Sequence, residues 1–373
     1  MRVAIVTESF FPQVNGVTNT VRHTVDRLLQ TGHEPVVIAP GPGAASYRNA
    51  PVVRVRSMAL PRYTSFPIGL PDPVVERTLA QFRPDVVHLA SPIALGAVGM
   101  RAALKLDLPT VAVYQTDIGG FVRQYGLRAE PAVARWVGRI HRRAGRTLAP
   151  STASLMQLGR MGVPNLHRWG RGVSLDLFGP ECRSDELRSH WTRGRDEVVV
   201  GYVGRLAAEK QVRRLAALAD LPGVRLVVVG DGPERAALGR LLPRARFTGM
   251  LSGVDLARAY ASLDVFVHTG EAETFCQTVQ EAQASGVPVV APAAGGPIDL
   301  VDHGRTGLLY APGSDADLRQ HVAHLVHDPE NRRHLGEQGR TAVASRTWPA
   351  VVDQLIHEHY AAVRRPGLAA AAA

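Results

Sequence analysis

The chain has 373 residues, of which 45% are hydrophobic and 20% charged, so it is long enough for two domains and too apolar to be extensively disordered. The spacing of its two cysteines, Cys182 and Cys276, suggests neither a disulfide framework nor a zinc site, and we expect no metal and a reducing, cytoplasmic compartment. No apolar run approaches the ~20 residues that span a bilayer, and the strand-like start at residues 2–6 leads us to expect no signal peptide.

The formal net charge of +10 is carried by the N-terminal half. Residues 1–176 hold 21 Lys and Arg against 10 Asp and Glu, whereas residues 177–373 hold 22 against 23. A uniform excess can reflect codon bias toward arginine. An excess confined to one half favours an anionic partner, either a membrane surface or a nucleic acid.

The first half alternates strand-like and helix-period segments. An apolar stripe through Val17, Val21, Val25 and Leu28 predicts a helix that ends at Gly32. The predicted strands of this half lie at residues 2–6, 35–39, 52–56, 85–90 and 110–114. Alternation of this kind predicts a parallel sheet with helices on both faces.

The same alternation begins again in the second half, with predicted strands at residues 198–203, 224–229, 246–247, 265–268 and 287–291. We therefore predict an α/β protein with two doubly wound, Rossmann-like parallel-sheet domains, and we expect ligand where the strand ends of both face a common cleft. The Gly- and Pro-rich stretch 164–180 marks the boundary. The predicted domains are residues 1–168 and 172–347, with a closing helix at 348–365 that packs back on the first domain.

The strand at 198–203 opens into a loop that carries two cations, Arg205 and Lys210. Gly204 lets backbone approach a ligand closely, and the cations follow the carboxyl end of the strand, where α/β sheets bind ligands. A diphosphate suits a bidentate guanidinium beside a mobile ammonium. Taken alone, the two cations are equally consistent with a solvated loop.

A second motif pairs two glutamates eight residues apart. We predict a helix over 274–285, with Glu273 just before its first turn and Glu281 two turns inside it. The free amides of Thr274, Phe275 and Cys276 would point toward an anion or hydroxyl. Each glutamate alone could be an ordinary helix residue. Together with the two cations they indicate a nucleotide-sugar site.

The segment Gly-Arg-Leu-x-x-Glu-Lys, the Glu-x7-Glu element and the turn Gly230-Asp-Gly-Pro233 together resemble glycosyltransferase family 4, whose members are retaining enzymes of the GT-B fold. The resemblance spans nearly the whole chain. Residues 7–19, 114–117 and 274–281 resemble, more narrowly, the actinobacterial GDP-mannose-dependent α-mannosyltransferases, and also the sulfoquinovosyl-diacylglycerol synthases.

The resemblance implies an acceptor-binding N-terminal domain, a donor-binding C-terminal domain and a role for each matching residue. Arg205 and Lys210 would bind the donor diphosphate, Glu273 the donor sugar and Glu281 the ribose. The other implied donor contacts are Gly16, from the first domain, the turn glycine Gly232, the backbone around Met250 for the base, and the amides of Thr274, Phe275 and Cys276.

The acceptor side departs from the family pattern. Many relatives carry a histidine where this chain has Tyr114-Gln-Thr-Asp117. His88 and Asp117, each near the end of a predicted strand, are the polar candidates closest to the acceptor. We expect Asp117 in the active site, whereas His88 is equally consistent with a core histidine. Asp299 lies in a loop that resembles the family's Gly-Gly-x-Pro-Glu loop with one residue displaced, which leaves its role open.

The implied reaction is a metal-independent transfer of a hexose, mannose from GDP-mannose, with retention at the anomeric carbon and no cofactor. No residue presents itself as a covalent nucleophile, which suits a front-face mechanism. The alternatives are a transferase that uses a UDP-sugar (glucose, GlcNAc or sulfoquinovose), a nucleotide-sugar 2-epimerase and a non-enzymatic nucleic-acid binder. The aromatic content of 6% disfavours the last.

Residues 132–146 predict a helix with Arg135, Arg139, Arg142 and Arg146 on one stripe and apolar residues opposite. These arginines could simply be solvated. A cation near an anionic leaflet is worth roughly 1 kcal/mol, so four aligned arginines suit an anionic membrane surface. With the family resemblance, this predicts a lipid-linked or glycolipid acceptor and peripheral attachment to the inner face of the cell membrane.

Overall fold

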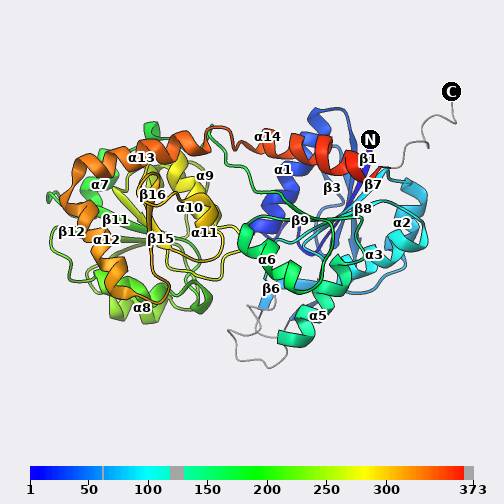
Figure 1. Cartoon of the computed structure of the whole chain (residues 1–373), viewed down its shortest axis with the longest axis horizontal. Helices are drawn as coiled ribbons and strands as arrows, with labels where there is room; N and C mark the ends of the chain where they lie inside the picture. The colour runs from blue at the N-terminus through cyan, green and yellow to red at the C-terminus, as the bar shows by residue number, and fades with distance from the viewer. Residues whose placement is uncertain (61–62, 118–129, 365–373) are drawn as a thin grey trace. The chain divides into compact units, whose positions relative to one another are not determined.

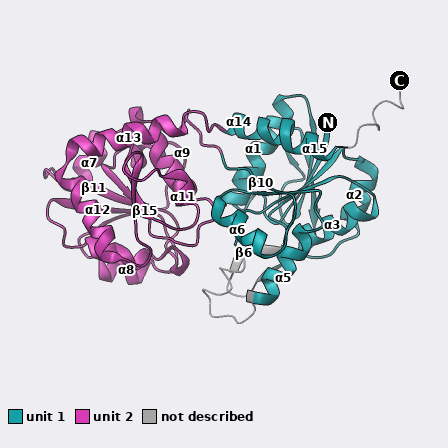
Figure 2. Ribbon diagram, in the orientation of Figure 1, with its two compact units in different colours: residues 1–171, 348–373 teal, residues 172–347 magenta. Residues whose placement is uncertain are grey.

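A computed structural model of the chain describes residues 1–60, 63–117 and 130–364 (Figure 1). The chain divides into two units (Figure 2). One contains residues 1–171 together with the C-terminal segment that begins at Trp348, and the other contains residues 172–347. The second unit is thus inserted into the sequence of the first.

The sheet of the first unit has the strand order β10-β9-β8-β7-β1-β2-β4-β3. All neighbours in it are parallel except the two-residue β3, which runs antiparallel to β4. Its strands are β1 Arg2–Thr7, β2 Glu34–Pro40, β3 Ser46–Tyr47, β4 Ala50–Val55, β7 Val86–Ala90, β8 Thr110–Val113, β9 Arg146–Ala149 and β10 Leu166–Arg168. A separate hairpin joins β5 Ser57–Leu60 to β6 Tyr63–Gly69.

Helices cover both faces of this sheet. Because successive side chains of a strand point to opposite faces, Ile5 of β1 packs with one set of helices and Val6 with another. The helices of the first unit are α1 Gly16–Gln30, α2 Val74–Phe82, α3 Leu95–Lys105, α5 Glu130–His141 and α6 Thr152–Arg160, and the C-terminal segment forms α14 Trp348–Gln354, the π-helix η4 Leu355–Tyr360 and α15 Ala361–Val363. Both faces of the central strands are buried, which explains why these strands are continuous apolar runs in the sequence.

The sheet of the second unit has the order β13-β12-β11-β14-β15-β16, all parallel. Its strands are β11 Val198–Val203, β12 Val224–Val229, β13 Arg246–Gly249, β14 Val265–Val267, β15 Val289–Pro292 and β16 Gly307–Tyr310. Its helices are η1 Pro180–Cys182, α7 Asp185–Thr192, η2 Ala208–Lys210, η3 Val212–Leu218, α8 Arg235–Leu241, α9 Gly253–Ala261, α10 Gln277–Ala284, α11 Pro297–Leu300, α12 Asp315–His327 and α13 Pro329–Val343. The prediction of two doubly wound parallel sheets is confirmed.

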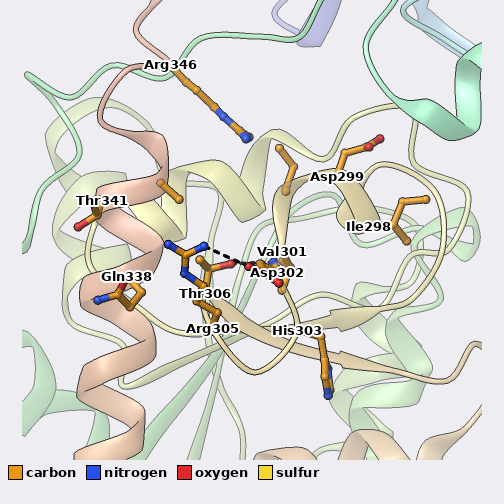
Figure 3. A pocket seen from close by; sticks show the side chains of 12 residues that line it. Ile298, Asp299, Val301, Asp302, His303, Arg305, Thr306, Gln338, Thr341 and Arg346 are labelled. Carbon is orange, nitrogen blue, oxygen red and sulfur yellow. Dashed lines mark hydrogen bonds and ion pairs between the residues drawn. The ribbon is translucent and has the colours of Figure 1, made fainter.

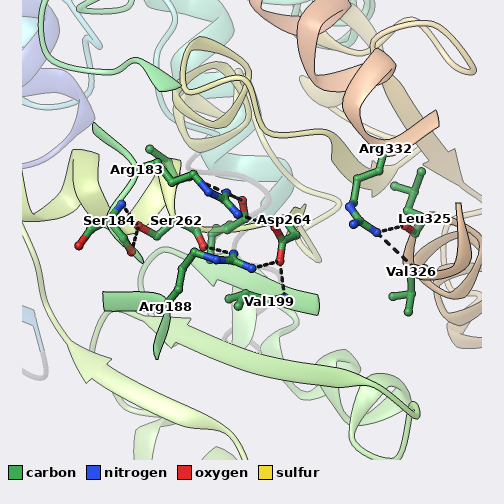
Figure 4. Close-up of polar contacts among 11 residues, drawn as sticks. Arg183, Ser184, Arg188, Val199, Ser262, Asp264, Leu325, Val326 and Arg332 are labelled. Carbon is green, nitrogen blue, oxygen red and sulfur yellow. Dashed lines mark hydrogen bonds and ion pairs between the residues drawn. The ribbon is translucent and has the colours of Figure 1, made fainter. Parts of the chain in front are cut away.

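A partly buried carboxylate ties α7 to the sheet of the second unit (Figure 4). Asp264, just before β14, accepts hydrogen bonds from Nη2 of Arg183 at 3.1 Å and of Arg188 at 2.9 Å. It also accepts the backbone N–H of Val199 at 2.8 Å. One side chain therefore joins the start of β11 to the loop before β14, the two strands at which the order of the sheet reverses.

The predicted helix 132–146 is wrong at its C-terminal end. The helix α5 stops at His141, and Arg146 opens strand β9, where it pairs in register with Val111. Pairing buries the next three residues of β9, which a longer helix would not do. The guanidinium of Arg146 donates to the carbonyl of Glu358 at 3.1 Å. The four-arginine stripe therefore does not exist as predicted.

Two of its members, Arg135 and Arg139, remain exposed on α5, and Arg142 is exposed just after the end of that helix. Nη1 of Arg142 donates to the carbonyl of Met161 at 2.6 Å. The basic surface that persists is thus formed by Arg135, Arg139 and Arg142.

The C-terminal segment completes the core of the first unit. Tyr360 is fully buried, and its hydroxyl lies 2.7 Å from Nδ1 of His88 in β7. Burial lowers the pKa of His88 to about 3, so the ring is neutral. Asp353 of α14 accepts two hydrogen bonds from Arg27 of α1, at 2.7 and 2.6 Å. His88 is therefore a core histidine, which settles the choice that the sequence left open.

No helix among the described residues is long and apolar enough to cross a bilayer.

Tyr360→Phe should lower the free energy of unfolding by about 1–3 kcal/mol, because it leaves a buried ring nitrogen of His88 without its partner. Urea unfolding of the full chain measures this. Arg364→Ala, on an exposed side chain four residues further, is the control and should change stability little. Equal effects of the two substitutions would contradict the role given to the Tyr360 hydroxyl.

Candidate functional site

The candidate site lies in the second unit, where its strand order reverses. The strands β11 and β14 are neighbours in the sheet, and their outer neighbours, β12 and β15, continue it in opposite directions. Loops after such strands diverge and leave room for a ligand at the carboxyl edge. The loop after β11 carries Arg205 and Lys210, and the loop after β14 carries His268 and Glu273.

Lys210 and Glu273 meet directly, and the sequence-predicted site residues of the two loops are thereby brought together. Nζ of Lys210 lies 2.6 Å from Oε1 of Glu273. The same carboxylate oxygen lies 3.2 Å from Nε2 of His268. The hydroxyl of Thr269 donates to the carbonyl of Lys210 at 2.7 Å and thereby holds the backbone of Lys210 in place.

These contacts hold the charges ionised in a poorly hydrated place. Burial alone would raise the pKa of Glu273, but the Lys210 charge and the His268 ring outweigh it and hold that pKa below its usual range. Burial alone would lower the pKa of Lys210, but the Glu273 carboxylate raises it. Burial likewise lowers the pKa of His268, but Cys276 and Glu273 outweigh it and raise that pKa to about 10. The site therefore holds two cationic groups around one carboxylate at neutral pH.

The helix predicted at 274–285 is present, but its first residue lies three positions later than predicted. The helix α10 starts at Gln277, and Cys276 caps it with φ 80°, in the left-handed region that a continuing helix forbids. The amides of Thr274, Phe275 and Cys276 thus belong to a loop rather than to the first turn, and Glu273 lies four residues before the helix. The expectation that these three amides are helix-mouth donors is wrong.

A neighbouring loop holds this segment in place. The N–H of Gly296 donates to the carbonyl of Glu273 at 2.8 Å. A Cβ at Gly296 would lie 2.0 Å from the carbonyl oxygen of Phe275, so no side chain fits there. Gly270 similarly makes room, since its Cβ would lie 3.1 Å from Oε1 of Glu273 and from Nε2 of His268. Glycines therefore set how closely the loops approach the charged group.

The turn Gly230–Pro233 lies against the loop that follows β11. Gly232 has φ 152°, and a Cβ there would lie 2.4 Å from the carbonyl oxygen of Leu206. Arg205 is about half exposed and pairs with Glu209 at 3.4 Å. Met250, just after β13, is 80% exposed. Gly232 thus shapes the carboxyl edge of the sheet, whereas Arg205 and Met250 expose their side chains.

Glu281 lies within α10. Its Oε2 accepts the hydroxyl of Tyr260 at 2.9 Å. Burial raises the pKa of Glu281 to about 7, against the hydrogen bond from Tyr260, which lowers it. Burial therefore favours the protonated form of Glu281 more than that of an exposed glutamate.

Gly16 of the first unit is the first residue of α1. The Asn15 side chain caps this helix by accepting the amides of Val17 and Thr18, both at 3.0 Å. A Cβ at Gly16 would lie 2.7 Å from Nη1 of Arg171, so the guanidinium sits close against the helix start. A contribution of the Gly16 amide to donor binding stays a prediction.

Asp117 follows β8 and accepts hydrogen bonds from the hydroxyl of Tyr114 at 3.1 Å and from Nε2 of Gln157 at 2.9 Å. It is thus a partly buried carboxylate, positioned by two neutral donors at the carboxyl edge of the first sheet. Its place near an acceptor stays a prediction.

Asp299 lines a cavity of about 550 Å³ in the second unit (Figure 3). Arg305 and Asp302, which form an ion pair at 3.5 Å, and Arg346 lie around the same cavity. The described lining residues do not include Lys210 or Glu273. The role of Asp299 in donor binding therefore stays open.

Sequence reasoning missed two residues of consequence. His268 was read only as the end of a strand, although a histidine directly after an apolar parallel strand lies at the ligand-binding edge. Glu8 is 3% exposed, and its carboxylate accepts the amides of Ile93 and Gly96, at 2.7 and 2.8 Å, at the start of α3. No sequence signal distinguishes that buried carboxylate from an exposed one.

Two family models match the chain. Residues 14–177 match Glycosyltransferase Family 4, and residues 183–342 match Glycosyl transferases group 1. The GDP-mannose-dependent alpha-mannosyltransferase of Mycolicibacterium smegmatis is 51% identical over 380 residues, covering 100% of both chains. The protein of the same name from Mycobacterium tuberculosis is 50% identical, covering 98% of this chain and 97% of its own. Sulfoquinovosyl transferase SQD2 of Arabidopsis thaliana is 34% identical, covering 97% and 74%.

Solved structures agree on the architecture. Anabaena Alr3699/HepE in complex with UDP superposes with a TM-score of 0.79 at 21% identity, covering 97% of this chain and 100% of that one. Sucrose-phosphate synthase from Thermosynechococcus elongatus has a TM-score of 0.78 at 22% identity, covering 97% and 99%. Identities this low establish the fold alone. With both family matches and relatives of up to 51% identity, the chain belongs to glycosyltransferase family 4 and is a glycosyltransferase of the GT-B fold.

Proposed function

We propose that this enzyme transfers mannose from GDP-mannose to a lipid-linked or glycolipid acceptor, with retention at the anomeric carbon and without a metal. The observation that carries the donor site is the contact of Lys210 with Glu273 at the point where the strand order of the second sheet reverses. The donor identity rests on the relatives of 44–51% identity that are named GDP-mannose-dependent alpha-mannosyltransferases.

The paired charges suit a sugar diphosphate. On donor binding, Lys210 exchanges the carboxylate of Glu273 for phosphate oxygens, and Glu273 accepts hydroxyls of the sugar. Arg205, which is about half exposed, reaches the same diphosphate. Until then each charge stabilises the other, so neither is left unpaired in a buried place.

In the proposed reaction the bond between the anomeric carbon and the diphosphate oxygen breaks, and the acceptor oxygen bonds to that carbon on the same face. The acceptor proton passes to the leaving diphosphate, and GDP departs. Lys210 and Arg205 lower the barrier by stabilising the charge that develops on the diphosphate. Glu273 orients the sugar. The carboxylate of Glu281, set by the hydroxyl of Tyr260, accepts the ribose hydroxyls.

The remaining donor contacts are proposed at Gly16, Gly232, the backbone around Met250 and the loop amides of Thr274, Phe275 and Cys276. For the acceptor we propose Asp117, because it lies at the carboxyl edge of the first sheet, where Tyr114 and Gln157 position its side chain. Peripheral attachment to the inner face of the cell membrane is proposed for the basic surface of Arg135, Arg139 and Arg142. An acceptor carried in a membrane would then meet the enzyme at that surface.

GDP-mannose at roughly 100 times its Kd should stabilise the protein by about 2.7 kcal/mol and raise its Tm by several degrees. UDP-glucose and UDP-GlcNAc at the same concentration should give little shift. Differential scanning fluorimetry in the presence of a chelator checks the identity of the donor and whether its binding needs a metal. A larger rise in Tm with a UDP-sugar would mean that this UDP-sugar, and not GDP-mannose, is the donor.

Lys210→Met should reduce kcat/KM for mannosyl transfer by roughly 10²–10³, because it removes a cation from the developing diphosphate charge. It should also lower stability, because Glu273 loses its partner. The double variant Lys210→Met/Glu273→Gln should regain stability in urea unfolding and stay inactive. Arg213→Ala, an exposed cation three residues further, is the matched control. An active double variant would refute the donor-site assignment.

Reversal of Arg135, Arg139 and Arg142 to Glu should weaken binding to phosphatidylserine vesicles by roughly two orders of magnitude, since each cation contributes about 1 kcal/mol. The donor-induced shift in Tm should be unchanged. Reversal of Arg77, Arg101 and Arg240, which are exposed on other helices, is the matched control. Vesicle sedimentation measures both. Undiminished binding by the first triple variant would mean that these arginines are only solvated.

A further inference from the structure

Three side chains of different chemistry meet in the loop after β14. A ring nitrogen of His268, a carboxylate oxygen of Glu273 and the sulfur of Cys276 all lie within 4.8 Å of one another. Imidazole, carboxylate and thiolate are the ligands that zinc uses in proteins, at bond lengths of about 2.0–2.3 Å. Tetrahedral geometry at those lengths separates ligand atoms by roughly 3.3–3.8 Å. Side-chain shifts of about 1 Å would therefore close this set around one ion.

The His268 ring gives an independent sign of a ligand. It is 2% exposed, and among the described residues its ring nitrogens make no well-aligned hydrogen bond, because their contacts are with Glu273 and Cys276, the other two members of the set. Its Nε2 lies 3.2 Å from Oε1 of Glu273 without hydrogen-bond geometry. Buried ring nitrogens nearly always have a partner, because leaving them without one is costly. A metal ion would supply that partner.

The backbone of Cys276 is a further sign that the thiol has a use. With φ 80° the residue occupies a conformation that suits glycine and strains a residue with a side chain. Such strain gathers at functional sites. Glycine at this position would be relaxed but would remove the sulfur.

We propose that His268, Glu273 and Cys276 form a binding site for Zn²⁺ and that the bound ion excludes the sugar nucleotide. Zn²⁺ would take the Glu273 carboxylate from Lys210, whose Nζ lies 2.6 Å away, and the proton of the Cys276 thiol and any proton on the coordinating ring nitrogen of His268 would pass to solvent. The exclusion rests on the proposed donor site, because it needs Glu273 for the donor sugar. The metal site itself does not.

Co²⁺ serves as the probe of the metal site, since cobalt bound to a thiolate gives a near-ultraviolet charge-transfer absorption that Zn²⁺ displaces. The purified full chain should show this band. Cys276→Ser and Cys276→Gly should lose this band and bind Co²⁺ at least about tenfold more weakly. Changes to residues around the direct ligands already weaken metal binding by that much, so the loss of a ligand should weaken it at least as far. Cys182→Ser, the other cysteine, should keep it. Cys276→Gly relieves the backbone strain, so circular dichroism separates a lost site from a lost fold.

Absence of the band in the full chain, or its persistence in Cys276→Ser, would overturn the metal site. The exclusion has its own measurement: saturating Zn²⁺ should reduce the donor-induced rise in Tm, and a chelator should restore it. An unchanged rise with Zn²⁺ bound would overturn the exclusion alone. Failure of the donor to shift the Tm without Zn²⁺ would instead count against the proposed function.

Discussion

The ion pair of Lys210 with Glu273 is the interaction on which the candidate site depends. It joins two loops that are 63 residues apart in sequence and meet because their strands, β11 and β14, are neighbours. Each charge would be less stable alone, since the two side chains are only 29% and 13% exposed. The ion pair therefore holds two groups at one site: a cation that can bind phosphate and a carboxylate that can bind hydroxyls. A sugar nucleotide presents the matching groups, a diphosphate and sugar hydroxyls, a few ångströms apart.

The strands could be predicted from sequence because parallel strands buried on both faces read as uninterrupted aliphatic runs, as in Val198–Val203. Arg146 shows where this fails, since an arginine that opens a strand has the same helical spacing from Arg135 as a true helix residue. β16, Gly307–Tyr310, is short and opens with glycine, so no apolar run marks it. Family motifs, rather than periodicity, gave the site residues.

The contacts within the site could not be predicted, because they depend on backbone geometry that residue types do not state. The helix α10 starts at Gln277 and not at the predicted Thr274, because Cys276 adopts a left-handed conformation that is unusual for any residue but glycine. The same turn places a thiol beside His268. The mutual stabilisation of Lys210 and Glu273 also changes how Lys210 should be understood, from a cation that awaits a ligand to half of a structural pair.

The insertion of the second unit into the first has a consequence for biosynthesis. Tyr360 reaches His88 across 272 positions of the chain, and Val173 forms a bridge with Thr347 where the polypeptide leaves the second unit. A ribosome releases the second unit whole before α14 and η4 emerge. Until the C-terminal segment with α14 and η4 is synthesised, part of the hydrophobic surface of the N-terminal half stays uncovered. We therefore expect the nascent N-terminal half to be prone to aggregation until the C-terminal segment packs on it.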